Sequence, residues 1–209
     1  MNKNLTLTGM MGVGKSTIGK NLAKKLKYNF IDVDKLIEAK ERSSVNFIFE
    51  NKSENYFRKI EKDITLKMLK KKNSVISLGG GAFLDKSIRK YAKKRTVSFW
   101  LDLNIDELVK RLKRSKKRPL LHKKDIGETI KKIYLEREKI YNEADFKVKC
   151  NSLKSKYASL KQFPKDFQSH LVPGVRILEK FHLEKPDGFG IHSEFVKTST
   201  AVCLSGKNQ

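Results

Sequence analysis

Short apolar runs alternate along this chain with longer stretches in which apolar residues recur every three or four positions. A run of four to eight apolar residues is typical of a buried strand, whereas a period near 3.6 is typical of a helix with one apolar face. Ile18, Leu22 and Leu26 form one such helical stripe, with lysines on the opposite face. The pattern predicts strands at 5–8, 28–34, 74–78, 96–101 and 145–150, and helices at 17–27, 35–41, 45–50, 54–71, 85–93, 104–114 and 126–143.

The order of the predicted elements indicates the fold class. Strands that alternate with helices are typical of α/β proteins with a parallel sheet. The strands are apolar along most of their length, as expected of a sheet that helices cover on both faces. We therefore expect a three-layer α/β fold with a parallel sheet of about five strands.

The composition of the chain changes near residue 162. Three of the four prolines and three of the four histidines lie beyond that point. Residues 161–209 hold only 7 of the 47 Lys and Arg side chains and show no sustained helical or strand period. We interpret 1–161 as one α/β domain and 162–209 as an irregular or disordered extension of unknown role.

The formal net charge of +24 has two interpretations. One is a basic face that binds nucleic acid, and the other is a lysine-rich surface around an active site for anionic substrates. The lysines are spread over the whole chain, and the sequence has no RNA-binding or zinc-finger motif. We therefore favour the second interpretation and expect no specific nucleic-acid partner.

The sequence also bears on location and redox chemistry. No apolar run approaches the ~20 residues that a membrane span needs, and the N-terminal residues lack a signal-peptide pattern. We expect a cytoplasmic protein with no membrane partner. Cys150 and Cys203 lie far apart in the chain, so we expect two reduced thiols without a metal or redox role.

The first stretch with recognisable chemistry is LTGMMGVGKST, residues 7–17, between the first strand and the first helix. It matches the P-loop pattern G-x-x-x-x-G-K-[ST]. Glycines let backbone amides approach phosphate oxygens, and the helix that follows aims its positive end at the same anion. The lysine adds a point charge, and the serine hydroxyl is a ligand for Mg²⁺. The predicted nucleotide site consists of Gly12, Val13, Gly14, Lys15, Ser16 and Thr17.

Two aspartates end the second predicted strand. Asp32 and Asp34 are two positions apart, so on an extended strand their side chains would share one face. The carboxyl end of a strand in an open α/β sheet is its ligand-binding edge. One carboxylate could hold Mg²⁺ while the other accepts a proton from a hydroxyl group. The alternative interpretation is an N-cap for the next helix.

A run of glycines and three arginines each allow two interpretations, one structural and one functional. The run of three glycines at 79–81 follows a strand and is either a turn or a second place where the backbone approaches a ligand. Arg58 and Arg137 lie on predicted helices, and Arg118 lies in the basic stretch between two helices. Each of the three arginines, taken alone, is most simply a solvated charge.

The combination of these motifs resembles shikimate kinase, a family of P-loop kinases of the nucleoside-monophosphate-kinase type. The matching segments occur in the family's order and extend over residues 3–150. They are GMMGVGKST, FIDVD, FRKIE, SLGGGAF, RPLL and YLEREKIY.

The resemblance implies roles on the acceptor side of the site. Asp34 would bind the shikimate hydroxyls and act as the base, and Gly80 would offer its backbone to the substrate. Arg58 and Arg137 would grip the carboxylate, as suits the two parallel donors of a guanidinium group. Glu61 would position Arg58. The implied substrate-binding set is Asp34, Arg58, Glu61, Gly79, Gly80, Gly81 and Arg137.

The resemblance also implies roles on the nucleotide side. Ser16 and Asp32 would bind Mg²⁺, and Lys15 would bind the terminal phosphates of ATP. Arg118 would come from a mobile lid that closes over ATP and would stabilise charge on the transferring phosphoryl group. Arg111 would lie against the adenine.

Two positions depart from the family pattern. The glycine that usually precedes the glutamate of the G-E-x-x-F-R motif is Ser53 here, and a glycine common upstream is Arg42. Both lie in the scaffold of the acceptor region, so we expect an effect on loop geometry.

The implied function is ATP-dependent phosphorylation of the 3-hydroxyl of shikimate to shikimate 3-phosphate, in chorismate and aromatic amino acid biosynthesis, by a monomer. One alternative is another small-molecule P-loop kinase such as a gluconate kinase, which the arginine pair and SLGGGAF disfavour. A second is a basic nucleic-acid-binding P-loop protein, which only the net charge suggests. A catalytically inactive relative is disfavoured because all the polar residues are present.

Overall fold

The computed structural model of the protein describes residues 4–114 and 126–150. The strands are β1 (Asn4–Thr8), β2 (Asn29–Asp32), β3 (Ser74–Ser77), β4 (Thr96–Asp102) and β5 (Phe146–Lys149). The helices are α1 (Lys15–Leu26), α2 (Val33–Glu41), α3 (Val45–Asn51), α4 (Glu54–Met68), the 3-10 helix η1 (Ala82–Leu84), α5 (Lys86–Arg95), α6 (Ile105–Lys113) and α7 (Ile126–Tyr141). The predicted alternation of strands and helices is confirmed.

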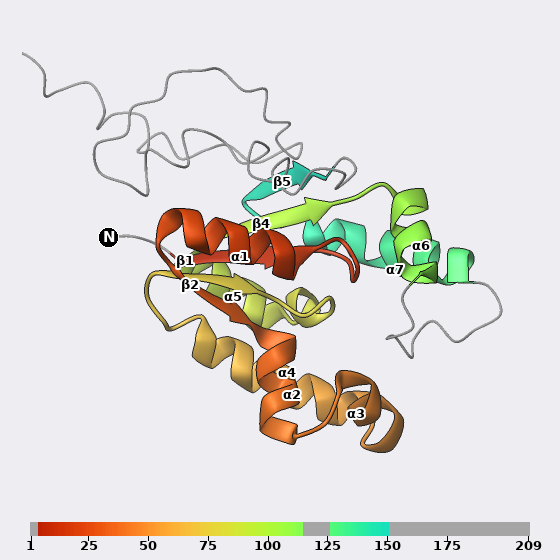
Figure 1. Cartoon of the computed structure of the whole chain (residues 1–209), viewed down its shortest axis with the longest axis horizontal. Coiled ribbons are helices and arrows are strands. Elements are labelled where there is room, and N and C mark those ends of the chain that lie inside the picture. The colour runs from red at the N-terminus through yellow and green to blue at the C-terminus, as the bar shows by residue number, and fades with distance from the viewer. Residues whose placement is uncertain (1–3, 115–125, 151–209) are drawn as a thin grey trace, which may run out of the picture.

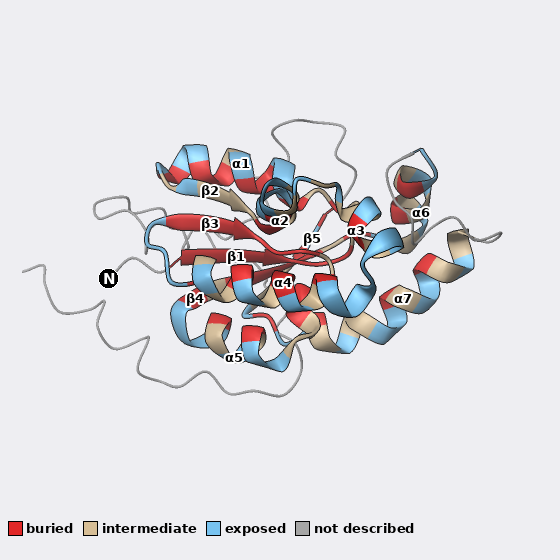
Figure 2. Ribbon diagram, turned by 90° about the horizontal axis from the view of Figure 1, so that it is seen from below, coloured by how far each residue is buried: buried red, intermediate tan, exposed pale blue. Residues whose placement is uncertain are grey.

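The five strands form one parallel sheet in the order β2-β3-β1-β4-β5, flanked by helices (Figure 1). Helix α1 lies on one face, and α4 and α5 lie on the other (Figure 2). Every residue of β1 is buried, because the central strand of a parallel sheet is covered on both sides. The predicted three-layer class is therefore confirmed.

The strand order has a topological switch point beside β1. In an open α/β sheet, ligands bind outside the carboxyl ends of the strands where the order reverses. Strands β1 and β3 are direct neighbours, with Leu7 paired to Ser77. The P-loop follows β1 and the three glycines follow β3, so two motifs about 70 positions apart in the sequence meet at one edge.

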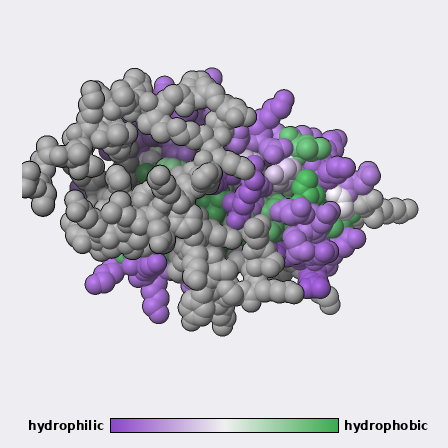
Figure 3. Space-filling view, turned by 90° about the horizontal axis from the view of Figure 1, so that it is seen from above, coloured by the Kyte–Doolittle hydropathy of each residue, from purple (hydrophilic) through white to green (hydrophobic). Residues whose placement is uncertain are grey.

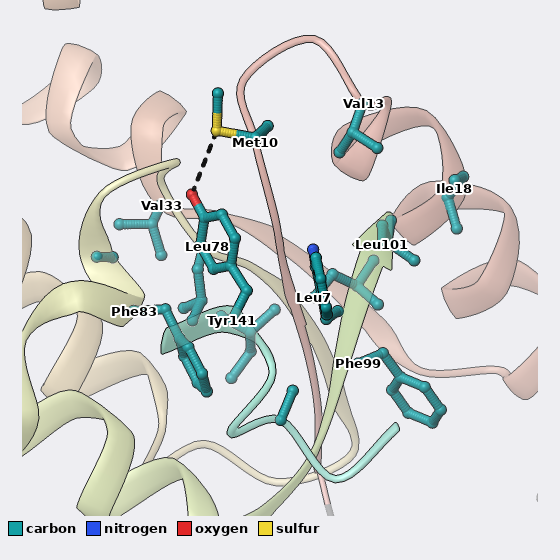
Figure 4. Packing of buried hydrophobic residues seen from close by; sticks show 14 of the residues in the cluster. Leu7, Met10, Val13, Ile18, Val33, Leu78, Phe83, Phe99, Leu101 and Tyr141 are labelled. Atoms are coloured by element: carbon teal, nitrogen blue, oxygen red, sulfur yellow. Dashed lines mark hydrogen bonds between the residues drawn. The ribbon is translucent and has the colours of Figure 1, made fainter. Parts of the chain in front are cut away.

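Apolar side chains from both faces of the sheet hold this edge in place. Leu7, Phe99 and Leu101 extend from the central strands at 0–1% exposure, and Ile18 packs from α1 (Figure 4). The predicted stripe of α1 is buried as expected. The helix begins at Lys15, two residues before the predicted start, because Gly14 adopts a left-handed conformation at its N-cap, with φ 101°.

One predicted boundary was wrong in a way that matters for the site. The strand expected at 28–34 ends at Asp32, whose side chain accepts a hydrogen bond from the Lys35 amide and so caps α2. Asp34 therefore lies in the first turn of a helix and does not share a strand face with Asp32. The short helix η1 was not predicted, because three residues are too few to show a period.

The surface is consistent with the composition. Described residues on one face are mostly hydrophilic, with a smaller hydrophobic area among them (Figure 3). Within 4–114 and 126–150, no helix is both long and apolar enough to cross a bilayer. Cys150 is a free, buried thiol. Cys203, Arg118 and the proposed extension 162–209 lie outside the described residues.

Candidate active site

The P-loop encloses the ammonium group of Lys15. Its Nζ donates to the carbonyl oxygens of Gly9 and Met10, at 2.9 and 3.1 Å, and the residue is 9% exposed. A cavity beside the loop is lined by Gly12, Gly14, Lys15, Ser16 and Thr17. The loop and the start of α1 therefore gather a cation, hydroxyl groups and a helix N-terminus around one space, as a bound phosphate requires.

Ser16 and Asp32 form a pair of oxygen ligands at the same edge. The Ser16 hydroxyl donates to Asp32 Oδ2 at 2.6 Å, although the two residues belong to α1 and β2. Mg²⁺ in kinases takes one or two protein oxygens and completes its octahedral coordination with phosphate oxygens and water. Among the described residues, no group of three or more His, Cys, Asp or Glu side chains could hold a metal. The Ser16–Asp32 pair fits a nucleotide-bound Mg²⁺.

A second cavity adjoins the first on the side of α3, α4 and α7. It combines two arginines and two carboxylates with an apolar wall. Its lining is Met11, Asp34, Val45, Asn46, Phe49, Phe57, Arg58, Glu61, Gly80, Gly81 and Arg137. The structure thus brings Asp34, Arg58, Glu61 and Arg137 together from three helices, as the sequence-based set requires.

Glu54 and Glu61, on the same helix as Arg58, hold its guanidinium group. Arg58 Nη1 donates to Glu61 Oε2 at 2.6 Å, and Nη2 donates to Glu54 Oε1 at 3.0 Å. The spacings i,i+3 and i,i+4 place these side chains on one face of α4. The Arg58 guanidinium carbon also lies 5.8 and 5.4 Å from the ring centroids of Phe49 and Phe57. Ion pairs and aromatic rings together fix the direction of this cation.

Glu61 is a buried acid with unusual proton affinity. The side chain is 2% exposed, and its Oε1 is a buried oxygen with no hydrogen-bond partner. Desolvation raises the pKa of Glu61 to about 6, and the charge and hydrogen bond of Arg58 oppose that rise. Asp34 pushes the pKa in the same direction as burial.

The three glycines after β3 allow charged groups to approach the backbone. A Cβ built at Gly79 would overlap Glu61 Oε1 and lie 2.7 Å from Asp34 Oδ1. A Cβ at Gly81 would overlap the guanidinium group of Arg58. Gly80 has more room, since its Cβ would lie 3.4 Å from the Met11 nitrogen. The absence of a side chain at Gly79 therefore leaves the space that the carboxylates of Glu61 and Asp34 occupy.

Two further sequence-predicted arginines donate to backbone carbonyls of the site loops. Arg137 donates to the Gly80 carbonyl at 3.1 Å and lines the second cavity. Arg111 lies beside the P-loop and donates to the Val13 carbonyl at 3.4 Å. Arg118 falls in the segment 115–125, outside the described residues.

Sequence reasoning missed the apolar wall of the second cavity. Phe49, Phe57, Met11 and Val45 line it beside the charged groups. The sequence held a partial signal, because Phe57 and Met11 stand inside two of the motifs. Only the fold shows that Phe49 and Phe57 meet, with ring centroids 4.6 Å apart.

The two cavities share a wall. Met11, Asp34 and Gly80 line both. A molecule held by the arginines in the second cavity would therefore present its groups to Asp34 at the border of the phosphate-binding cavity. This arrangement suits transfer of a phosphoryl group to a hydroxyl beside Asp34.

Comparisons with known proteins agree with this geometry. The family model described as shikimate kinase matches residues 11–168. A curated shikimate kinase from Persephonella marina is 40% identical over 146 residues, which are 70% of this chain and 88% of that protein.

Two solved structures are also similar. A shikimate kinase from Acinetobacter baumannii in complex with shikimate has a TM-score of 0.73 at 29% identity, covering 77% of this chain and 90% of that one. A shikimate kinase from Aquifex aeolicus has a TM-score of 0.69 at 36% identity, covering 82% and 99%.

Proposed function

The chain belongs to the shikimate kinase family, and on that premise we propose that it transfers the γ-phosphoryl group of ATP to the 3-hydroxyl of shikimate. The products are shikimate 3-phosphate and ADP. The observation that carries this proposal is the wall that the two cavities share at Asp34. A nucleotide in one cavity and a small hydroxy acid in the other would meet at that carboxylate.

Asp34 is proposed as the group that receives the proton. The 3-hydroxyl oxygen attacks the γ-phosphorus, the bond to the β-bridging oxygen breaks, and the hydroxyl proton passes to the Asp34 carboxylate. The start of α2 places this residue beside the P-loop rather than on β2. The P-loop amides and Lys15 would stabilise the negative charge that develops on the phosphoryl group and on ADP.

Arg58 and Arg137 are proposed to bind the shikimate carboxylate. A guanidinium group offers two parallel N–H donors to a carboxylate, and two such groups line the cavity from α4 and α7. Glu61 and Glu54 hold Arg58 in place, and the apolar wall of Phe49 and Phe57 suits the carbon ring. Gly80 and its neighbours would offer backbone groups to the hydroxyls.

Ser16 and Asp32 are proposed to hold the Mg²⁺ that accompanies ATP. The metal would supply positive charge to the phosphate groups of ATP. We further propose that Arg111 contacts the adenine and that Arg118 contacts the phosphates, both on the strength of the resemblance alone. The same resemblance supports a domain of residues 1–161 that acts as a monomer in the cytoplasm.

The test of this function is acceptor selectivity. ADP release from Mg²⁺-ATP is measured with shikimate, gluconate, a nucleoside monophosphate or no acceptor. We expect release that depends on shikimate alone. Equal release with gluconate, which also carries a carboxylate and hydroxyls, would contradict the assigned acceptor.

Two variants separate the two cavities. Lys15→Ala is expected to remove turnover with any acceptor, because the terminal phosphates lose their cation. Arg58→Ala is expected to raise the KM for shikimate at least tenfold while the KM for ATP changes little, since half of the carboxylate clamp is lost. An Arg58→Ala enzyme with unchanged shikimate kinetics would contradict the role of Arg58.

A further inference from the structure

Tyr141, the last residue of α7, is a buried side chain that the proposed mechanism does not use. It is 0% exposed, and its ring lies 6.0 Å from that of Trp100. Its hydroxyl reaches the functional edge of the sheet, where it donates to the Gly80 carbonyl and lies 3.9 Å from Met10 Sδ (Figure 4). One buried oxygen thus contacts both the P-loop and the loop after β3.

The hydroxyl has one hydrogen, and the carbonyl is its acceptor. A thioether sulfur is a weak acceptor, so the hydrogen is directed to Gly80 and the Met10 sulfur packs against the oxygen. Burial raises the pKa of Tyr141, although Arg137 opposes the rise, so the hydroxyl remains a donor over the neutral range. The Tyr141 hydroxyl therefore keeps the hydrogen that it donates to the Gly80 carbonyl.

Gly80 connects Tyr141 to the proposed carboxylate clamp. The same carbonyl oxygen accepts Arg137 Nη1 at 3.1 Å. A carbonyl oxygen has two lone pairs, so with Tyr141 on one of them it holds a single N–H of Arg137. Arg137 also acts on the Tyr141 hydroxyl directly, through its charge and a side-chain hydrogen bond. Arg137 and Tyr141 are four positions apart on α7, so they face the same carbonyl from adjacent turns.

The hydrogen bond also orients the backbone of the glycine run. The Gly80–Gly81 peptide is planar, so fixing its carbonyl fixes the Gly81 N–H in the opposite direction. Further contacts join η1, which follows the glycine run, to a residue just after α7. Arg89 donates to the carbonyls of Phe83 and Leu84 and pairs with Glu143 at 3.0 Å.

We propose that Tyr141 is a positioning residue of the acceptor site, which holds the Gly80 carbonyl, and through it Arg137, in the arrangement that receives the acceptor's carboxylate. This inference rests on the proposed function. It assigns a functional role to a side chain that packing alone would otherwise explain.

The test is Tyr141→Phe, which keeps the ring and removes one oxygen. The expected result is a rise of about 3- to 10-fold in the KM and dissociation constant for shikimate, the range of one hydrogen bond. The KM for ATP and kcat are expected to stay within about twofold of the wild-type values, because the P-loop keeps its own contacts. Melting curves of the variant establish that it is folded.

Tyr134→Phe is the matched control. Tyr134 lies on the same helix at 8% exposure, and its hydroxyl donates to Asp102 Oδ1 at 2.8 Å, away from both cavities. This variant loses a comparable hydrogen bond and is expected to keep its shikimate KM. Replacing Tyr141 by 4-aminophenylalanine, which restores a donor at the same place, is expected to recover most of the lost affinity.

Three results would overturn the inference. The first is an unchanged shikimate KM in a folded Tyr141→Phe protein. The second is an equal rise in Tyr134→Phe, and the third is a parallel rise in the KM for ATP; both indicate general loosening of the fold. Absence of shikimate turnover by the wild-type chain would instead reject the proposed function, and the inference would fall with it.

Discussion

Two acidic residues, Glu61 and Asp34, occupy the space that a side chain at Gly79 would fill. Glu61 and Asp34 direct carboxylate oxygens at the Gly79 Cα, and a methyl group there would displace them. Both acids lie at the ends of flexible side chains, so the displacement would alter the site more than the fold. Arg58 would follow, because its Nη1 is paired with Glu61 at 2.6 Å.

Gly79→Ala is therefore expected to give a folded protein with impaired use of shikimate. We expect kcat/KM for shikimate to fall at least tenfold, equivalent to about 1.4 kcal/mol, because Asp34 and the Arg58–Glu61 pair move. Gly80→Ala is the comparison, since its Cβ meets Met11 nitrogen at an ordinary 3.4 Å. A larger loss in Gly80→Ala than in Gly79→Ala would contradict this description.

Glu61 makes the stability of the folded protein depend on pH. The direction of this dependence follows from the burial of Glu61, which raises its pKa. Its pKa rises from 4.5 to about 6 in the folded state. The folded protein therefore holds a proton that the unfolded chain has released between these pH values, and stability falls as pH rises through that window. At pH 7 the buried charge costs about 2 kcal/mol relative to pH 4. The site retains that cost because the ionised form is the one that holds Arg58.

Glu61→Gln tests this linkage. The free energy of unfolding of the wild type minus that of the variant is expected to fall by about 2 kcal/mol in total between about pH 3.5 and pH 7, most steeply between the two pKa values, and to stay level above about pH 7. Denaturant titrations at several pH values measure it. The affinity of the wild type for shikimate is expected to weaken below about pH 6, as Glu61 is protonated. A pH-independent difference in stability would contradict the raised pKa.

The functional residues were only partly predictable from the sequence at this scale. The P-loop was identifiable from spacing and context, because its glycines, lysine and serine are required at fixed positions. Taken alone, Arg58 and Arg137 could not be told from solvated charges. Only the family resemblance gave them a role, and the fold places both in the lining of one cavity. Tyr141 ends the motif YLEREKIY, but the role of its hydroxyl was not predictable, because hydrogen bonding to a distant carbonyl has no local pattern.

At the scale of elements, the two residues that depart from the family pattern share a backbone conformation. Arg42 caps the end of α2 with φ 49°, and Ser53 caps the start of α4 with φ 91° and ψ 157°. Both are positive-φ conformations that favour glycine. At the end of α2 and the start of α4, the backbone thus adopts a conformation that glycine tolerates but that is strained for Arg42 and Ser53.

Ser53→Gly is expected to stabilise the protein by about 1 kcal/mol, because relief of strain exceeds the few tenths lost with the Ser53 cap. This corresponds to a rise in Tm of about 2–4 °C, measured by calorimetry. Arg42→Gly is expected to act in the same direction by a similar or smaller amount. Ser44→Gly is the control, since Ser44 caps α3 at φ −67° and relieves no strain when replaced. The explanation fails if Ser53→Gly is no more stable than Ser44→Gly.

Element type was predictable where a period was long or a run fully apolar. The stripes of α1 and α4 and the buried strands at 74–77 and 96–102 follow the expected pattern. The end of β2 was not predictable, because Asp32 and Asp34 suit a strand end and a helix start equally well. The capping bond of Asp32 decides between them and moves Asp34 to α2.

At the scale of the whole molecule, the sheet order creates the site. The sequence predicted a parallel sheet but not its strand order. That β1 and β3 are neighbours depends on how the connections between strands pack, and no local sequence pattern shows this. That neighbourhood places the P-loop against the glycine run, and the Leu78 amide donates to the Leu7 carbonyl at 3.0 Å. The donor and acceptor cavities are adjacent because these two strands are.

The proposed domain boundary leads to a prediction for the whole chain. A chain shortened to residues 1–161, and one shortened to 1–168 where the family match ends, are expected to turn over shikimate at the rate of the full chain. The reason is that every described residue of both cavities precedes residue 150. A loss of activity in 1–161 that 1–168 restores would move the boundary, and a loss in both would give 169–209 a role in catalysis.

We propose that the two adjacent cavities together carry out one phosphoryl transfer to one hydroxyl of shikimate. The most direct measurement is ³¹P and ¹H nuclear magnetic resonance of the products formed from Mg²⁺-ATP and shikimate. The expected result is shikimate 3-phosphate, formed in a one-to-one ratio with ADP. Inorganic phosphate with unmodified shikimate, or phosphate on a different hydroxyl, would contradict the account.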